Sequence, residues 1–168
     1  MATIEDYFPV PYYGFQFRKV TNSLILSSSN FQGAISVMIQ NGLVNLELNV
    51  AFNRIDDIHF LKDFSFLKGL SIIGGLINDI NPIHSLSKLR TLDLSCNFSG
   101  KVDFGLFPEL TDCYITSGIN GCESIFSAFS LIELRIDKFK KCSFLRFLEL
   151  KNLRKLRLIY PGIQSIDI

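Results

Sequence analysis

Apolar residues recur along this chain with a period of 21 or 22 residues, and no other feature constrains its fold as strongly. The recurring unit has the form L-x-x-L-x-L, and it begins at Leu67, Leu89, Leu110, Leu131 and Leu153. Internal repeats of roughly 20–50 residues are typical of solenoids, in which each repeat stacks on the next. So regular a series of restarts predicts a solenoid over most of the 168 residues.

Each repeat is expected to contain one short strand. In L-x-x-L-x-L the last two apolar positions flank a single residue, so Leu70 and Ile72 face the core while Ser71 faces solvent. Parallel stacking pairs the backbones of neighbouring turns, and the leucines are buried only between neighbours. Further apolar residues follow the strand at intervals of three, which favours 3₁₀ or irregular turns over long α-helices.

The slot after each strand suits an asparagine, whose amide can hydrogen-bond the departing backbone. In this chain the slot holds Asn53, Gly75, Asn97, Gly118, Phe139 and Pro161. Glycine and proline allow the bend by their backbone geometry, but Phe139 does not. Local irregularity is therefore expected at Phe139.

The pattern weakens toward the N-terminus. Leu48 and Val50 are predicted to be the core residues of one more strand, and Leu24 and Leu26 to form a degenerate first strand, followed by a helical stretch from Ala34 to Ile39. Aromatic residues are expected to cap the first turn: Tyr7, Phe8, Tyr12, Tyr13, Phe15 and Phe17. We predict a single domain over residues 1–168, with the cap and degenerate first repeat in 1–44 and about six repeats in 45–168.

The repeat, with its I-x-x-I-x-x-L tail, resembles the short leucine-rich repeats of the internalin and protein-phosphatase-regulator type over residues 45–168. In size and architecture the chain also resembles the leucine-rich-repeat immunity proteins that neutralise bacterial polymorphic toxins. These resemblances imply an α/β fold: a right-handed leucine-rich-repeat solenoid with a parallel concave β-sheet and mostly irregular or 3₁₀ convex segments. They also imply a non-enzymatic module that binds another protein.

The outward residues of the concave strands are the predicted contact surface, because stacked strands expose them side by side. One column is read as Asn49, Ser71, Asp93, Tyr114, Arg135 and Arg157, and a second as Glu47, Gly69, Thr91, Asp112, Glu133 and Lys155. The predicted partner-binding residues are Asn49, Ser71, Asp93, Asp112, Tyr114, Glu133, Arg135, Lys155, Arg157 and Tyr160.

Charge is distributed unevenly. Residues 1–132 hold 8 Lys or Arg and 12 Asp or Glu, whereas residues 133–168 hold 9 and 4. The basic end could steer an acidic protein partner. Alternatively, charges such as Arg154, Lys155 and Arg157 protect the last strand, taken as a sheet edge, from unwanted pairing. Nucleic acid is not the expected partner, because the positive charge is confined to one end and no binding motif accompanies it.

No catalytic, metal or cofactor site is predicted. The cysteines lack a C-x-x-C pair, and His59 and His84 lie far from them in sequence, so buried reduced thiols are expected. In the repeat register both histidines fall on the return side, away from Cys113 in a core slot, which disfavours a Cys–His nucleophile. No glycine-rich phosphate-binding motif is present.

The expected location is cytoplasmic, because the N-terminus lacks a basic-then-apolar signal layout and no apolar run is long enough to span a membrane. The function predicted is binding of one protein partner through the concave face and the basic end, with toxin neutralisation as its most specific form. The alternatives are a regulatory or scaffold subunit of an enzyme and an internalin-like host or cell-surface binding domain. Because the chain ends in Ile163, Ile166 and Ile168, self-association through the C-terminal end is a further hypothesis.

Overall fold

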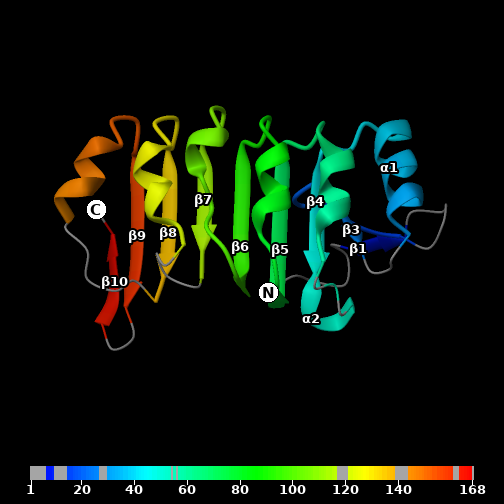
Figure 1. Ribbon diagram of the computed structural model, residues 1–168, viewed down its shortest axis with the longest axis horizontal. Coiled ribbons are helices and arrows are strands. Elements are labelled where there is room, and N and C mark those ends of the chain that lie inside the picture. Colours follow the sequence, from blue (N-terminus) through cyan, green and yellow to red (C-terminus); the bar gives the residue numbers. More distant parts are fainter. Residues whose placement is uncertain are drawn as a thin grey trace.

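In the described part of the chain ten strands form one sheet, and their order across the sheet is their order along the chain (Figure 1). The structure, a computed structural model, describes residues 7–9, 15–26, 30–53, 55, 57–116, 121–138, 144–160 and 163–167. At 7–9, 52, 53, 144, 160 and 163–167 it describes the backbone alone.

The strands are β1 (Tyr7–Pro9), β2 (Gln16–Arg18), β3 (Ser23–Leu26), β4 (Asn45–Asn49), β5 (Gly69–Ile77), β6 (Thr91–Phe98), β7 (Asp112–Ile115), β8 (Glu133–Asp137), β9 (Lys155–Tyr160) and β10 (Ile163–Asp167). Between them lie α1 (Phe31–Gln40), α2 (Val50–Asn53) and the 3₁₀ turns η2 (His59–Phe64), η3 (Asn81–Ser85), η4 (Phe104–Leu106), η5 (Glu123–Ser127) and η6 (Phe144–Glu149). Strands β3 to β9 are parallel, whereas β1, β2 and β10 add antiparallel pairs at the two ends.

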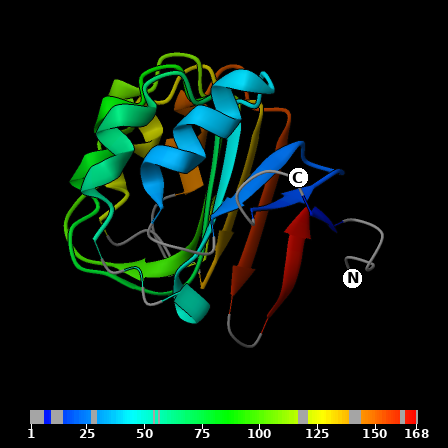
Figure 2. The same cartoon turned by 90° about the vertical axis from the view of Figure 1, so that its right-hand side faces the viewer.

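The molecule has two layers, the sheet on one side and the helical turns on the other (Figure 2). Every return segment from η2 to η6 contains a 3₁₀ turn, and in the part of the chain that the structure describes only the first return, α1, is a longer α-helix. The prediction of a parallel sheet with mostly 3₁₀ convex segments is confirmed. Apolar residues at intervals of three suit this geometry, because side chains three apart lie on one face of a 3₁₀ helix.

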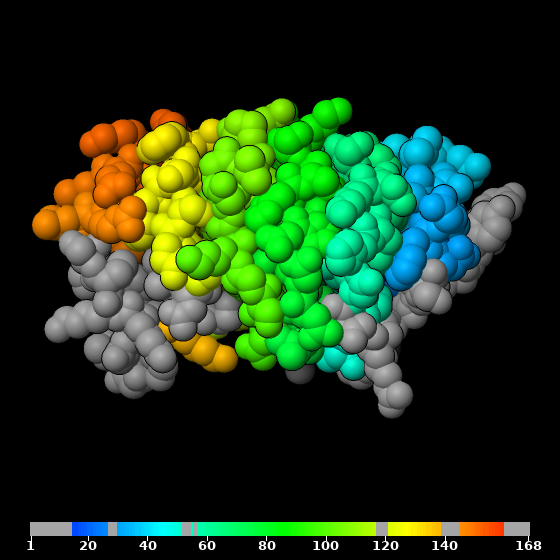
Figure 3. Space-filling model, in the orientation of Figure 1, coloured from blue at the N-terminus to red at the C-terminus, as the bar shows by residue number. Residues whose placement is uncertain are grey.

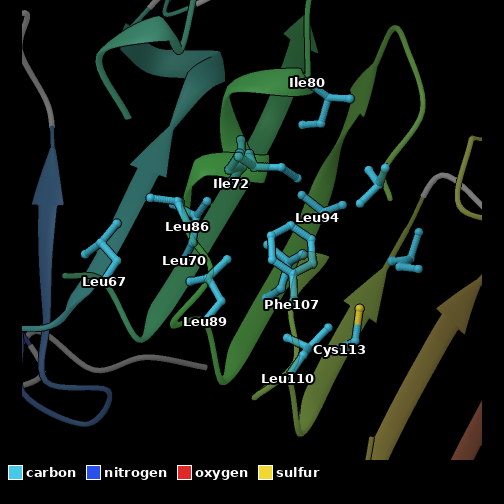
Figure 4. Close-up of a cluster of buried hydrophobic side chains, with 14 of the residues drawn as sticks. Leu67, Leu70, Ile72, Ile80, Leu86, Leu89, Leu94, Phe107, Leu110 and Cys113 are labelled. Carbon is cyan, nitrogen blue, oxygen red and sulfur yellow. The ribbon is translucent and has the colours of Figure 1, made fainter. Parts of the chain in front are cut away.

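The leucines of successive strands stand in register. Strand pairing aligns Leu46, Leu70, Leu92, Cys113, Leu134 and Leu156 in one file. A second file holds Leu48, Ile72, Leu94, Ile115, Ile136 and Leu158. These side chains fill the space between the two layers together with residues of the return segments, such as Ile80, Leu86 and Phe107 (Figure 4). Each turn buries its leucines against its neighbours, as the repeat predicts.

The repeat that begins with β4 is longer than predicted, and its strand was placed wrongly, although both predicted core residues, Leu48 and Val50, are buried. Leu46 and Leu48 pair with Leu70 and Ile72, so the strand lies two residues earlier than the pattern placed it. Val50 is buried but belongs to the short helix α2 and not to the strand. The repeat from β4 to β5 accommodates two extra residues, because the chain makes this helical turn before it leaves the sheet.

Two glycines of β5 make room for α2. Gly74 and Gly75 have φ values of +70° and +67°, a conformation that favours glycine. A Cβ atom on Gly75 would lie 2.6 Å from the side chain of Val50, and one on Gly74 would lie 2.8 Å from that of Ala51. Gly75 therefore allows the bend, as predicted, and also lets α2 pack closely against β5.

The last repeat strand, β9, is not a sheet edge, so the prediction for the C-terminal end was wrong. Strand β10 pairs antiparallel with β9, so the backbone of β9 has neighbours on both sides. The charges of Lys155 and Arg157 therefore do not guard an open edge. Two predictions lie outside the described residues. The first is the irregularity at Phe139, and the second is the apolar C-terminal end, because the structure describes neither Ile168 nor the side chains of Ile163 and Ile166.

At the N-terminal end, β1 and β2 extend the sheet beyond β3, the strand predicted around Leu24 and Leu26. The helix predicted around Ala34 is α1, and Asn30 caps it by accepting a hydrogen bond from the Gly33 amide at 3.0 Å. Phe15 is 2% exposed and belongs to the core, and Phe17 packs against it. Tyr12 and Tyr13 lie outside the described residues, and of Tyr7 and Phe8 the structure describes the backbone.

Substitution Leu94→Ala should lower the free energy of unfolding by about 2–5 kcal/mol, because Leu94 is fully buried and the turns on both sides hold the cavity open. Chemical denaturation followed by circular dichroism measures this loss. Leu76→Ala is the matched control: Leu76, in the neighbouring strand β5, is 52% exposed, and its loss should cost less than about 1 kcal/mol. Equal losses for the two variants would contradict the stacked core.

Candidate functional site

A groove of about 860 Å³ runs along the concave face of the sheet. Strand pairing defines the outward column of the parallel strands as Glu47, Ser71, Asp93, Tyr114, Arg135 and Arg157, and all but Arg157 line the groove. Neighbouring strands lie about 4.8 Å apart, so these six positions extend over roughly 25 Å. That length suits the footprint of a protein segment or small domain.

The N-terminal end of the groove is closed by an ion pair. Arg18 of β2 donates to Glu47 of β4 at 2.7 Å, and the Glu47 side chain is 8% exposed. A carboxylate this buried needs a cationic or hydrogen-bonding partner. The cap strand β2 therefore contributes a side chain to the groove and neutralises its first acidic residue.

Asp93 provides a carboxylate in the middle of the groove. It accepts hydrogen bonds from the hydroxyls of Ser71, at 3.2 Å, and Ser95. Burial raises the pKa of Asp93 above its ordinary value, although these two hydrogen bonds act in the opposite direction. Asp93 is thus a half-buried acid whose charge is costly to the folded protein.

Next to Asp93, three side chains form a connected network. The Tyr114 hydroxyl donates to Asp137 at 2.6 Å, and the Arg135 Nε donates to the same carboxylate at 3.1 Å. The guanidinium of Arg135 also lies 4.3 Å from the centre of the Tyr114 ring, a cation–π contact. Burial, together with the hydrogen bond to Asp137, raises the pKa of Tyr114 to about 12, so its phenol remains a donor.

A second column borders the groove and carries more acid than base. Strand pairing places Asp112 between Thr91 and Glu133, so two carboxylates lie directly opposite each other. Like charges in this arrangement are destabilising. Lys155 relieves part of the repulsion by pairing with Glu133 at 2.8 Å.

The shape of the chain matches that of known proteins, although its sequence does not. No protein-family model and no curated protein matches the sequence. An internalin (inlF) from Listeria monocytogenes matches the structure with a TM-score of 0.55 and 19% identity, over 76% of this chain and 37% of the internalin. The fold is a leucine-rich-repeat solenoid. The chain spans little more than a third of that internalin.

The leucine-rich-repeat ectodomain of the receptor kinase SOBIR1 from Arabidopsis thaliana matches 92% of this chain and 76% of its own length, with 15% identity and a TM-score of 0.46. The fold assignment rests on the internalin and on the strand register described above. At 19% identity the internalin match supports the fold alone, and the function has to be inferred from the concave face.

The leucine-rich-repeat register brings most of the predicted binding residues together. Ser71, Asp93, Tyr114, Arg135 and Arg157 share the central column, and Asp112, Glu133 and Lys155 share the bordering one. Asn49 does not join them, because it pairs with Ile73 and lies two residues beyond Glu47, which takes the central position. Placing Asn49 in the central column and Glu47 in the bordering one was wrong. Of Tyr160 the structure describes the backbone, as the end of β9.

The sequence analysis missed one residue that lines the groove, Arg18, and two that hydrogen-bond its central column, Ser95 and Asp137. Ser95 and Asp137 follow Asp93 and Arg135 by two residues, and strand alternation could have placed them on the same face. Arg18 could not have been found in this way. Its position depends on how the antiparallel strand β2 pairs with β3.

The described residues hold no group of three or more His, Cys, Asp and Glu side chains placed to bind a metal ion. Cys96, Cys113 and Cys122 are buried and not disulfide-bonded. Burial raises the pKa of the Cys96 and Cys122 thiols to about 12, so neither supplies an appreciable amount of thiolate. No helix in the described part of the chain is long and apolar enough to cross a membrane.

Substitution Asp93→Asn should stabilise the protein more at pH 7 than at pH 3.5. Folding raises the pKa of Asp93, so the protein loses stability as the pH rises from the pKa of this carboxyl in the unfolded chain through its pKa in the folded protein. Asparagine cannot ionise and therefore removes this loss. Thermal unfolding of both proteins at the two pH values gives the difference in Tm. Asp63→Asn, at an exposed position on η2, controls for the removal of one negative charge. A Tm difference independent of pH would contradict a strained carboxylate at position 93.

Proposed function

We propose that this protein binds one protein partner, without catalysis, through the concave groove and the basic C-terminal end. The observation that carries the proposal is the groove itself: half-buried polar side chains of successive strands line one continuous face. A leucine-rich-repeat sheet offers its outward residues as a ribbed surface, which suits contact with another protein. The central column supplies a carboxylate, an aromatic ring and a guanidinium within three neighbouring strands: Asp93, Tyr114 and Arg135.

These residue types favour a protein ligand. Tyr and Arg are among the residues that most often dominate the binding energy of protein interfaces, because each combines a large contact area with directional hydrogen bonds. The excess of basic residues in 133–168 supports an acidic surface on the part of the partner that meets this end. The partner segment over Asp93 and Asp112 would in turn carry donors or positive charge.

Neutralisation of a bacterial toxin is the most specific form of this proposal. It is supported by the repeat architecture, which resembles that of leucine-rich-repeat immunity proteins. It places the protein in the cytoplasm with the toxin as its partner. A toxin gene directly upstream of this one, and rescue of toxin-expressing cells by this chain, would support it. Co-purification of a phosphatase, kinase or ligase would favour a regulatory subunit instead. A longer precursor with a signal peptide and an anchor would favour an internalin-like surface domain.

Simultaneous substitution of Asp93, Tyr114 and Arg135 by alanine should weaken binding of the partner about 100-fold or more, because the three residues form the centre of the groove. The partner is first isolated by capture on the wild-type chain and identified by mass spectrometry. Titration calorimetry with the purified partner then gives both affinities. A melting curve of the triple variant shows that it is folded.

The matched control replaces an acid, a base and an aromatic outside the groove: Asp63, Lys88 and Phe129, all exposed. This variant should bind as the wild type does. Undiminished affinity in the groove variant, with its fold intact, would move the binding site off the concave face.

A further inference from the structure

The turn η6 leaves two leucines in water at the C-terminal end of the repeats. Leu145 is 73% and Leu148 is 67% exposed. Strand pairing relates this repeat to the preceding one by 22 residues, which makes Phe126 of η5 the counterpart of Leu148. Phe126 is 2% exposed, because η6 covers it: the ring centroids of Phe126 and Phe147 lie 5.2 Å apart, and the Arg146 guanidinium lies 4.1 Å from the Phe126 ring. Leu148 therefore occupies a position that the next layer of a longer stack would cover.

The surface around these leucines is accessible to a second molecule. The η6 segment, orange in Figure 1, lies at one end of the molecule, and the same segment forms the upper part of that end in Figure 3. Strand β10 covers β9 in the sheet layer and leaves both leucines exposed. Among the described residues, the turn η6 thus lacks the cover that the inner turns of the helical layer receive.

Two parallel stripes run along η6. Leu145 and Leu148 are three residues apart, so in a 3₁₀ helix they lie one above the other. Arg146 and Glu149 form the adjacent stripe with the same spacing, and their side chains are joined by an ion pair of 3.4 Å. The patch is therefore apolar along one side and carries one positive and one negative charge along the other.

We propose that this patch docks against the same patch of a second copy of the chain, about a two-fold axis that sets the two η6 turns antiparallel. Such an axis brings Leu145 against the second copy's Leu148, and Arg146 against the second copy's Glu149. An isologous contact requires a self-complementary surface. Two leucines beside one cation and one anion at matching spacing meet that requirement.

The dimer is weak, and the two ends that meet in it carry net charge of the same sign. The patch is small, so we expect a dissociation constant on the order of 100 μM. Residues 133–168 of each copy carry 9 Lys or Arg and 4 Asp or Glu, so the two ends repel at low ionic strength. Salt at about 0.3 M screens this long-range repulsion, while contacts at van der Waals distance are affected less.

Sedimentation equilibrium of the 168-residue chain, at about 5–500 μM and about 0.3 M salt, tests the proposal. The weight-average mass should rise with concentration from 19.0 kDa toward twice that value. The variant Leu145→Gln/Leu148→Gln should associate at least about tenfold more weakly. Ile39→Gln removes a 64% exposed isoleucine of α1 at the opposite end and should leave the association unchanged. A constant mass of 19.0 kDa, or equal association of the leucine variant, would overturn the proposal.

Charge reversal tests the antiparallel geometry itself. Arg146→Glu and Glu149→Arg should each weaken self-association about three- to tenfold, because each creates two like-charge contacts in the dimer. In an equimolar mixture the first variant offers two acids and the second two bases, so a heterodimer should form more tightly than either homodimer. A mixture that behaves as the average of the two single variants would rule out this axis.

Two further measurements separate the outcomes. Arg146 packs on Phe126, so its replacement could unfold the protein, and thermal unfolding shows whether Arg146→Glu is folded. If it is not, the variant Leu145→Gln/Leu148→Gln, which keeps Arg146, still tests the proposal. The groove variant at Asp93, Tyr114 and Arg135 should dimerise as the wild type does. Loss of partner binding with dimerisation intact, or the reverse, shows that the two surfaces act independently.

Discussion

The structure depends on the burial of leucine between consecutive turns of the chain. One turn has a single short strand and a single 3₁₀ segment, and neither can cover the aliphatic side chains that it presents. Leu94 of β6 is fully buried because Ile72 and Ile115 lie beside it in the sheet and the return segments lie beneath. The strand register, the even spacing of the outward residues and the shape of the groove all follow from this stacking. Stability is therefore shared between neighbours, and a defect in one turn weakens the turns on either side.

The repeat made most of this architecture predictable from sequence. From Leu67 onward the spacing is 21 or 22 residues, so the positions of the strands and the outward columns could be derived by counting. Counting fails where the number of residues per turn changes. The helical turn α2 adds two residues between β4 and β5, and this displaced the predicted strand and with it the assignment of Asn49. The strand register and the contact of α2 with Gly74 and Gly75 reveal the insertion, and both are tertiary.

The candidate site was predictable to the same extent and for the same reason. Residues fixed by the repeat, such as Asp93 and Arg135, were placed in the groove by their period. Residues that reach the groove from outside the repeat could not be placed in this way, and Arg18 is the example. Its ion pair with Glu47 depends on the antiparallel pairing of β2 with β3, which no periodicity in the sequence indicates. The strand β10 was missed on the same grounds. Periodic sequence describes the interior of a solenoid well and its two ends poorly.

The network of Tyr114, Arg135 and Asp137 has a consequence for the energetics of recognition. Its hydrogen bonds and the stacking of the guanidinium on the ring hold long side chains in one arrangement in the free protein. A mobile arginine would lose on the order of 1 kcal/mol of rotamer entropy on being immobilised by a ligand, and here most of that loss has already occurred during folding. The groove is in this sense preorganised: a complementary surface meets side chains that need little rearrangement. The groove would then discriminate between partners because a surface that does not complement these fixed side chains cannot be accommodated by rearranging them.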